Sequence, residues 1–230
     1  MTVMTINGTD ISNWNAKLLD FAPAPCPVTN ETTAASGTLY PVLLHSTTAP
    51  LSLSVTFDVY GRDMADAEMT ATRLLREVSS QCEIGGPDDF LYRCILTGAS
   101  RSRTVDWIVT LSLTFEAVRH KPKVSVRPEA GTGAVYCEGT VETPCILRIG
   151  TTAEGPISIS GDCWGTFGIQ ETGRSVIIDG IQKTVRLSNG ENCFLQTSLT
   201  KFPSLQPGLN TILADNDYTS IIIQYYPTFL

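Results

Sequence analysis

The sequence is poor in charge and in histidine. Charged residues make up 17% of its 230 residues, against the roughly 25% of an ordinary soluble chain. The formal net charge is −7, and this acidic balance argues against a protein that holds nucleic acid or an anionic membrane by charge. The histidines are His45 and His120, and neither has an acidic or nucleophilic residue at an informative spacing. A histidine general base would therefore lack a partner.

Long hydrophobic runs, nucleotide-binding motifs and paired cysteines are also missing. No apolar run approaches the roughly 20 residues that span a bilayer, and the N-terminus lacks a secretory pattern, so we expect a protein made in the cytoplasm with no membrane role. No phosphate loop or dinucleotide fingerprint is present. The seven cysteines include no Cys-x-x-Cys pair, so we expect Cys82, Cys94, Cys145 and Cys193 to be buried hydrophobic residues within strands rather than part of a zinc site. We expect neither a metal nor a cofactor.

Threonine is the commonest residue, and it indicates a β-rich fold. The chain has 29 threonines, 18 glycines and 13 prolines, and 42% of its residues are hydrophobic. β-branched side chains fit a pleated sheet better than a helix, and this hydrophobic content suffices for a core. The composition therefore predicts a folded, mainly β protein.

Two stretches alternate strictly between apolar and polar residues. Every odd position is apolar over 51–59 and again over 105–117. Alternation with period two predicts strands with one face on a core. The second stretch exceeds the usual strand length of about 3–10 residues, so we expect it to bend across two sheets or to protrude and pair with a neighbour. We place a subunit interface on its polar face, at Ile108, Thr110, Ser112 and Thr114.

One helix and one arm are predicted in the same half of the chain. Apolar residues recur at helical spacing over 63–79, with Asp63 as a suitable N-cap. Segment 22–35 begins with three alternate prolines, which cannot join a central sheet. We expect this segment to be a long exposed loop or arm.

A change of pattern near residue 120 predicts two domains. The run Arg-His-Lys-Pro-Lys over 119–123 interrupts the alternation and marks a boundary. Residues 1–120 are predicted to form an α+β domain with one helix. Residues 121–230 carry about eight short apolar runs separated by turn signals, the pattern of an antiparallel β-sandwich or jelly roll.

One motif resembles a catalytic motif, but its surroundings in the sequence do not support catalysis. Residues 161–165, Gly-Asp-Cys-Trp-Gly, fit a nucleophile elbow with Cys163 as the nucleophile. The elbow requires a following helix and a histidine downstream, but the next residues do not favour a helix and both histidines precede it. A Gly-flanked turn is the better interpretation, and we expect a protein that is not an enzyme.

Trp164 offers a second function. A tryptophan between glycines could stack on a sugar ring, although a lone tryptophan in a β-domain is more often part of the core. The alternative function is therefore a carbohydrate-binding module for host cell-wall polysaccharide, with Trp164 as the stacking platform.

The order of several stretches carries a family resemblance. These are the opening residues 6–21, the strand, helix and strands over 51–79 and 90–119, and the closing residues 202–212 and 221–229. The most specific is the Phe-Pro-x-Leu-x-Pro-Gly-x-Asn run that begins at Phe202. This pattern covers essentially the whole chain. In it, the sequence resembles the distal tail proteins of long-tailed phages and prophages.

The resemblance implies a structural protein of the virion tail tip. Family members form a homo-hexameric ring between the last ring of the tail tube protein and the tail-tip hub protein. Their first domain forms the ring, and their second, galectin-like or carbohydrate-module-like domain points outward and sometimes contacts a receptor-binding protein or a cell-wall sugar. DNA passes through the ring without specific binding. The acidic first domain, with 8 basic and 13 acidic residues in 1–120, suits such a lumen.

Overall fold

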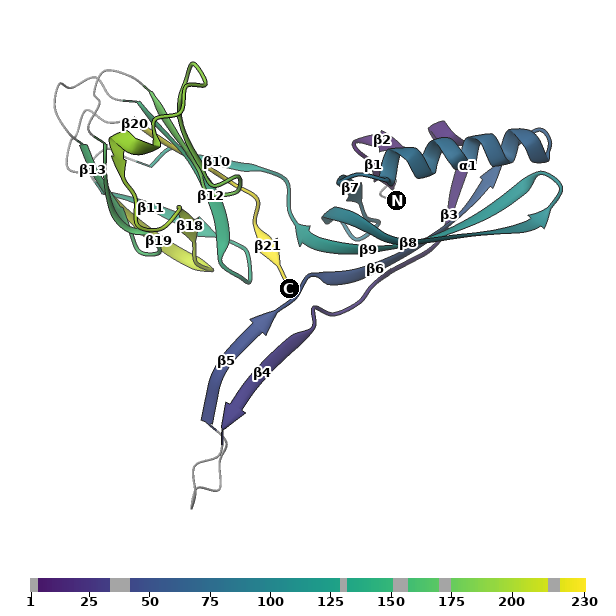
Figure 1. Ribbon diagram of the computed structural model, residues 1–230, viewed down its shortest axis with the longest axis horizontal. Coiled ribbons are helices and arrows are strands. Elements are labelled where there is room, and N and C mark those ends of the chain that lie inside the picture. The colour runs from purple at the N-terminus through teal and green to yellow at the C-terminus, as the bar shows by residue number, and fades with distance from the viewer. Residues whose placement is uncertain (1–3, 34–41, 129–131, 151–156, 170–174, 215–219) are drawn as a thin grey trace. The chain divides into compact units, whose positions relative to one another are not determined.

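The computed structural model describes residues 4–33, 42–128, 132–150, 157–169, 175–214 and 220–230. The chain divides into two compact units, one made of residues 1–119 with Leu230 and the other of residues 120–229. The elements are shown in Figure 1. Both units consist mainly of antiparallel strands, and the described residues include one α-helix. The mainly β fold with one helix is thus confirmed. The galectin-like or jelly-roll topology of the second unit stays a prediction.

Unit 1 is built on one antiparallel sheet, in the order β2-β1-β7-β8-β9-β6-β3. Its strands are β1 (Thr5–Ile6), β2 (Thr9–Asp10), β3 (Ala16–Pro23), β6 (Leu51–Tyr60), β7 (Cys82–Gly85), β8 (Leu91–Val105) and β9 (Ile108–His120). A short 3-10 helix, η1 (Ile11–Trp14), precedes β3. Two further strands, β4 (Val28–Thr33) and β5 (Val42–Thr48), form a separate hairpin that follows β3 and precedes β6.

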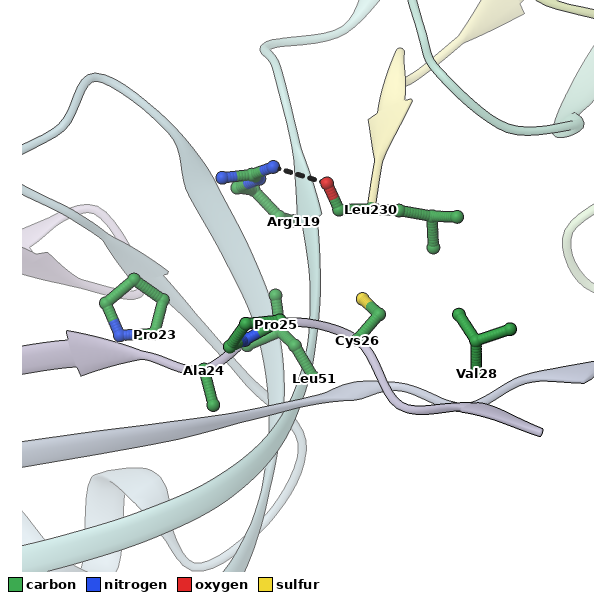
Figure 2. A pocket seen from close by; sticks show the side chains of 8 residues that line it. All are labelled: Pro23, Ala24, Pro25, Cys26, Val28, Leu51, Arg119 and Leu230. Atoms are coloured by element: carbon green, nitrogen blue, oxygen red, sulfur yellow. Dashed lines mark hydrogen bonds between the residues drawn. The ribbon is translucent and has the colours of Figure 1, made fainter.

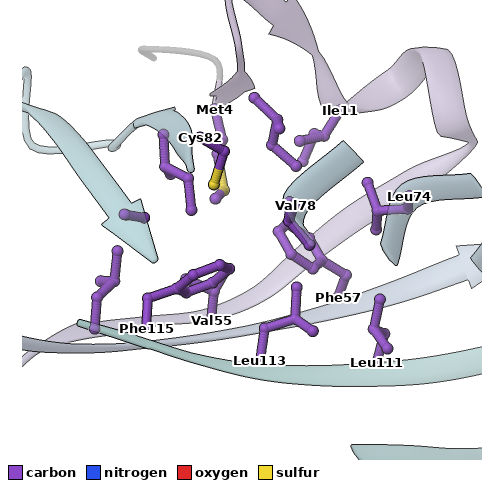
Figure 3. Packing of buried hydrophobic residues seen from close by; sticks show 14 of the residues in the cluster. Met4, Ile11, Val55, Phe57, Leu74, Val78, Cys82, Leu111, Leu113 and Phe115 are labelled. Atoms are coloured by element: carbon purple, nitrogen blue, oxygen red, sulfur yellow. The ribbon is translucent and has the colours of Figure 1, made fainter. Parts of the chain in front are cut away.

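The core of unit 1 lies on one face of this sheet. The odd residues of β6 are buried and the even ones are partly or fully exposed, as the alternation predicts. In the register of β6 with β9, Phe57 lies opposite Leu111 and Val55 opposite Leu113, and Figure 3 shows these side chains packed together. Burial of this apolar face at about 25 cal/mol per Å² is the main stabilising contribution.

The helix α1 (Met64–Val78) covers this face at the predicted place. Its buried residues are Ala67, Ala71, Leu74 and Val78. The side chain of Asp63 accepts a hydrogen bond from the backbone N–H of Asp66 at 2.9 Å, which caps the first turn. Arg76 in the last turn suits the negative end of the helix dipole.

The long strand expected over 105–117 is instead the second arm of a hairpin. β8 ends at Val105, Asp106 and Trp107 form the turn, and β9 begins at Ile108. The side chains of Val105 and Trp107 are 44% and 53% exposed, so they do not continue the buried row of β9. The alternation passes through the turn only because residues on both sides of it are apolar.

Unit 2 has two antiparallel sheets that share one hydrophobic core. One sheet contains β10 (Val124–Val126), β20 (Ser220–Tyr225), β12 (Thr143–Gly150), β15 (Val176–Asp179) and β16 (Thr184–Leu187) in this order, and β18 (Ser204–Leu205) also pairs with β12. The other contains β11 (Thr132–Cys137), β19 (Gly208–Ala214), β13 (Ile157–Gly161), β14 (Gly165–Ile169) and β17 (Thr197–Ser198). The remaining elements are η2 (Phe194–Gln196) and β21 (Thr228–Phe229).

The Phe-Pro-x-Leu-x-Pro-Gly-x-Asn run is explained by the turn that it forms. The buried Asn210 side chain accepts a hydrogen bond from the backbone N–H of Gln206 at 2.8 Å and donates to the carbonyl oxygens of Gln206 and Gly208. Gly208 has φ of 92°, which favours glycine. The run therefore holds the approach to β19 in one conformation.

The side chain of Glu142 stabilises the same segment through hydrogen bonds. Its carboxylate accepts hydrogen bonds from Lys201 Nζ at 2.8 Å and from Ser204 Oγ at 2.6 Å, and it lies 3.4 Å from Gln206 Nε2. The hydrogen bond from Lys201, followed by that from Ser204, holds the pKa of Glu142 below its usual value.

Replacing Glu142 by glutamine is expected to lower the free energy of unfolding at pH 7 by about 1 kcal/mol, since the carboxylate is 42% exposed and solvent screens it. A lowered folded-state pKa stabilises the protein above the unfolded pKa of about 4.3, and this contribution is lost as pH falls through the folded pKa. Urea unfolding at pH 7 measures the loss of stability, and the same measurement at pH 3 shows how this loss depends on pH. Glu138→Gln, which removes the exposed Lys121 ion pair, serves as the control and should have little effect. An equal loss of stability from Glu142→Gln at both pH values would contradict this prediction.

None of the helices among the described residues is long and apolar enough to cross a membrane.

Candidate assembly interface

The β4–β5 hairpin exposes every one of its residues. Its apolar side chains Val28, Val42, Leu43 and Leu44 are each more than half exposed, at 57%, 51%, 57% and 59%. Its described residues carry only two titratable side chains, Glu31 and His45, which lie opposite each other in the register. An isolated two-stranded hairpin is marginally stable in water, and clustered exposed apolar side chains mark interaction sites. The hairpin is therefore a candidate contact surface.

A mostly apolar cleft of about 410 Å³ lies at the base of the hairpin. Figure 2 shows its lining residues, which are Pro23, Ala24, Pro25, Cys26, Val28, Leu51, Arg119 and Leu230. The Arg119 guanidinium donates a hydrogen bond from Nη2 to the carbonyl oxygen of Leu230 at 2.6 Å and lies 4.8 Å from the centre of the Phe90 ring. The alternate prolines have no N–H to donate, so this wall offers carbonyl oxygens and apolar surface.

Backbone hydrogen bonds tie the base of the hairpin to β6 and join its two arms to each other. Ala24 N–H donates to the carbonyl oxygen of Ser52 at 2.8 Å, and Ala49 N–H donates to that of Pro27 at 3.0 Å. The segment 22–35, predicted to be a long exposed loop or arm, contains the end of β3 at Pro23 and the whole of the exposed strand β4 (Val28–Thr33). Residues 34–41 lie outside the described residues.

A second open surface is the outer half of β8. Its register with β7 covers only Leu91 to Cys94, so over residues 95–105 one backbone edge of β8 has no strand partner among the described residues. Ile95, the first residue of this edge, is 57% exposed. Unpaired strand edges bind further strands unless they are covered.

The predicted interface residues Ile108, Thr110, Ser112 and Thr114 lie on β9, on the face opposite the core. In the register with β6 they lie opposite Tyr60, Asp58, Thr56 and Ser54 in turn. The Thr110 hydroxyl donates to Asp58 Oδ1 at 2.7 Å, and the Thr56 hydroxyl donates to Ser112 Oγ at 3.4 Å. The structure places the four residues on one face of β9, where Ile108 is apolar and the other three are polar, and their role in an interface stays a prediction.

Trp164 does not have the exposure that sugar stacking needs. Its side chain is 3% exposed and belongs to the core of unit 2. A Cβ on Gly161 would lie 2.2 Å from the indole, so the preceding glycine makes room for the ring, and Gly165 adopts φ of 72° in the turn. The glycines around Trp164 thus serve packing and turn geometry rather than access for a ligand.

Cys163 is also unsuited to catalysis. Burial raises the pKa of its thiol, which disfavours the thiolate needed for nucleophilic attack. The residues that follow form β14 and not a helix. Among the described residues, no group of three or more His, Cys, Asp or Glu side chains is placed to hold a metal ion.

Comparison with known proteins identifies the architecture. No family model and no curated protein matches the sequence. The crystal structure of SPP1 Dit (gp 19.1), described as a paradigm of the hub adsorption apparatus in phages that infect Gram-positive bacteria, matches with a TM-score of 0.77 and 13% identity over 99% of this chain and 99% of that chain. The chain has the Dit fold.

The Dit fold extends over both units. Two structures of the phage p2 baseplate in its activated conformation, one with Sr and one with Ca, match at a TM-score of 0.56 and 8% identity, over 94% of this chain and 92% of the matched chain. The resemblance of the sequence to distal tail proteins is thus confirmed at the level of the fold.

Proposed function

We propose that this protein is a distal tail protein that forms a homo-hexameric ring at the end of a phage tail tube. The ring joins the tail tube protein to the tail-tip hub protein and the host-adsorption apparatus, and it has no catalytic role. The end-to-end match to SPP1 Dit carries this proposal. The exposed β4–β5 hairpin supports it, because its apolar side chains are more than half exposed within a single chain.

A second copy of the chain is the occupant that best fits these surfaces. A ring is built from heterologous contacts, in which one patch of each copy meets a different patch of the next. Unit 1 offers two unlike patches, the apolar hairpin and the open edge of β8. The hairpin supplies apolar side chains, and the edge supplies the N–H and C=O groups that a further strand would pair with.

The charge of unit 1 supports a ring through which DNA passes. Residues 1–120 carry 8 basic and 13 acidic residues, a net charge of 8 − 13 = −5. A negative wall repels the phosphate backbone and so reduces non-specific binding.

The full chain is expected to be a hexamer at high concentration. Native mass spectrometry and multi-angle light scattering measure the mass, which should be six times that of the chain, and negative-stain electron microscopy should show rings. A chain that stays monomeric at every concentration and never enters tail particles would overturn the proposal.

A further inference from the structure

A polar cleft in unit 2 is separate from the surfaces described so far. It has a volume of about 270 Å³ and lies along the edge strand β16, between the turn after β15 and the segment that leads into η2. Its lining includes Gln182, Lys183, Arg186, Asn192 and Phe194. All five side chains belong to exposed residues, so a ligand can reach them directly.

Two cations line the cleft without an acidic partner. Neither Lys183 nor Arg186 forms an ion pair with any residue that the structure describes. The nearby Asp179 carboxylate is buried and accepts the backbone N–H groups of Ile181 and Gln182 at 2.9 and 2.8 Å. On a chain with a net charge of −7, these two side chains give the cleft a local positive charge.

An aromatic wall stands beside the cations. The Phe194 ring is 43% exposed and stacks on Phe202, with ring centres 6.5 Å apart and planes at 24°. Lys183 Nζ lies 5.3 Å from the centre of the Phe202 ring, which fixes the position of the cation. Asn192 Oδ1 accepts the backbone N–H of Phe194 at 3.0 Å, so the amide and the aromatic ring are held together.

We propose that this cleft binds a phosphate-bearing sugar. The planar guanidinium of Arg186 matches two oxygens of a phosphate group. The exposed face of Phe194 suits the apolar C–H face of a sugar ring, and the amides of Gln182 and Asn192 suit its hydroxyl groups. All of these residues belong to unit 2, so the proposal does not depend on ring formation.

Isothermal titration of the full chain with glucose 1-phosphate tests the proposal. Arg186→Gln and Phe194→Ala are each expected to weaken binding by about tenfold, because one removes a charged hydrogen bond and the other a stacking contact. Lys123→Gln removes the same charge from an exposed residue that does not line the cleft, and it should leave binding unchanged. Thermal unfolding of each variant confirms that it is folded.

Two further ligands define the specificity. Inorganic phosphate and glucose alone should each bind more weakly than glucose 1-phosphate, and a methyl phosphodiester of glucose should bind comparably if the source is a polymer of sugar phosphates. A free sugar phosphate as the source would instead favour the monoester. No binding of any of these probes, binding of phosphate that is insensitive to Phe194→Ala, or an equal loss from Lys123→Gln would overturn the proposal, whatever the oligomeric state.

Discussion

Replacing Leu111 by glutamate is expected to unfold unit 1. Leu111 is fully buried on β9 opposite Phe57. A glutamate carboxylate at this position would be surrounded by apolar side chains (Figure 3). An unpaired charge in such a place costs more than about 4 kcal/mol, which is a large part of the stability of about 5–15 kcal/mol of a typical domain. Circular dichroism and urea unfolding should show the loss of the cooperative transition of unit 1.

The neighbouring residue provides the matched control. Ser112 lies on the opposite, polar face of β9, where its side chain is only partly buried. Ser112→Glu adds the same charge one residue further along and should cost less than about 1 kcal/mol of stability. Loss of ring assembly by a folded Ser112→Glu protein would mark this face as an interface. A folded Leu111→Glu protein would contradict the described core.

Placing two aspartates on the tip half of β5 is expected to abolish ring assembly without unfolding the chain. Leu43 and Leu44 are 57% and 59% exposed, so their replacement removes few contacts within one chain. Buried between two copies, each would be an apolar anchor worth about 2 kcal/mol or more. Leu43→Asp with Leu44→Asp should therefore weaken assembly at least a hundredfold, as measured by native mass spectrometry across a dilution series.

A double variant on the same strand separates apolar contact from charge. Ser46→Asp with Thr48→Asp adds the same two charges to exposed polar residues of β5 and should retain the ring. Thermal unfolding should give the wild-type midpoint for both double variants. Intact rings formed by the double variant at Leu43 and Leu44, or an equal loss in the control, would show that the apolar side chains of the hairpin do not make the contact.

The elements that the sequence predicts well are those with a local period. β6 and α1 are readable because burial of one face imposes a period of two on a strand and of about 3.6 on a helix. The turn at Asp106 and Trp107 is not readable, since the residues on both sides of it continue the alternation by chance. Period alone does not distinguish a strand that continues from one that turns back.

The candidate surfaces are less accessible to prediction than the elements. The Pro-rich stretch predicts an exposed arm, but the pairing of β4 with β5 depends on residues on both sides of a long connection. The uncharged triplet Val42-Leu43-Leu44 is the available signal for its apolar character. The glycine neighbours of Trp164 suggest an exposed platform on a loop, whereas Gly161 makes room for the buried indole. The cleft beside β16 cannot be predicted from the sequence, because Lys183 and Arg186 come close to Phe194 only when the chain is folded.

The carbonyl oxygen of Leu230 accepts a hydrogen bond from Arg119, which is the last residue before unit 2. The last described residue belongs to unit 1, while residues 120–229 form unit 2. Among the described residues, unit 2 follows Arg119 directly along the chain, and Leu230 comes after it. Each unit has a hydrophobic core of its own, so unit 2 can be exchanged while the sheet and helix of unit 1 keep their packing. A chimera in which a different domain replaces residues 120–229 is therefore expected to keep the sheet and helix of unit 1 folded, as circular dichroism and urea unfolding would measure.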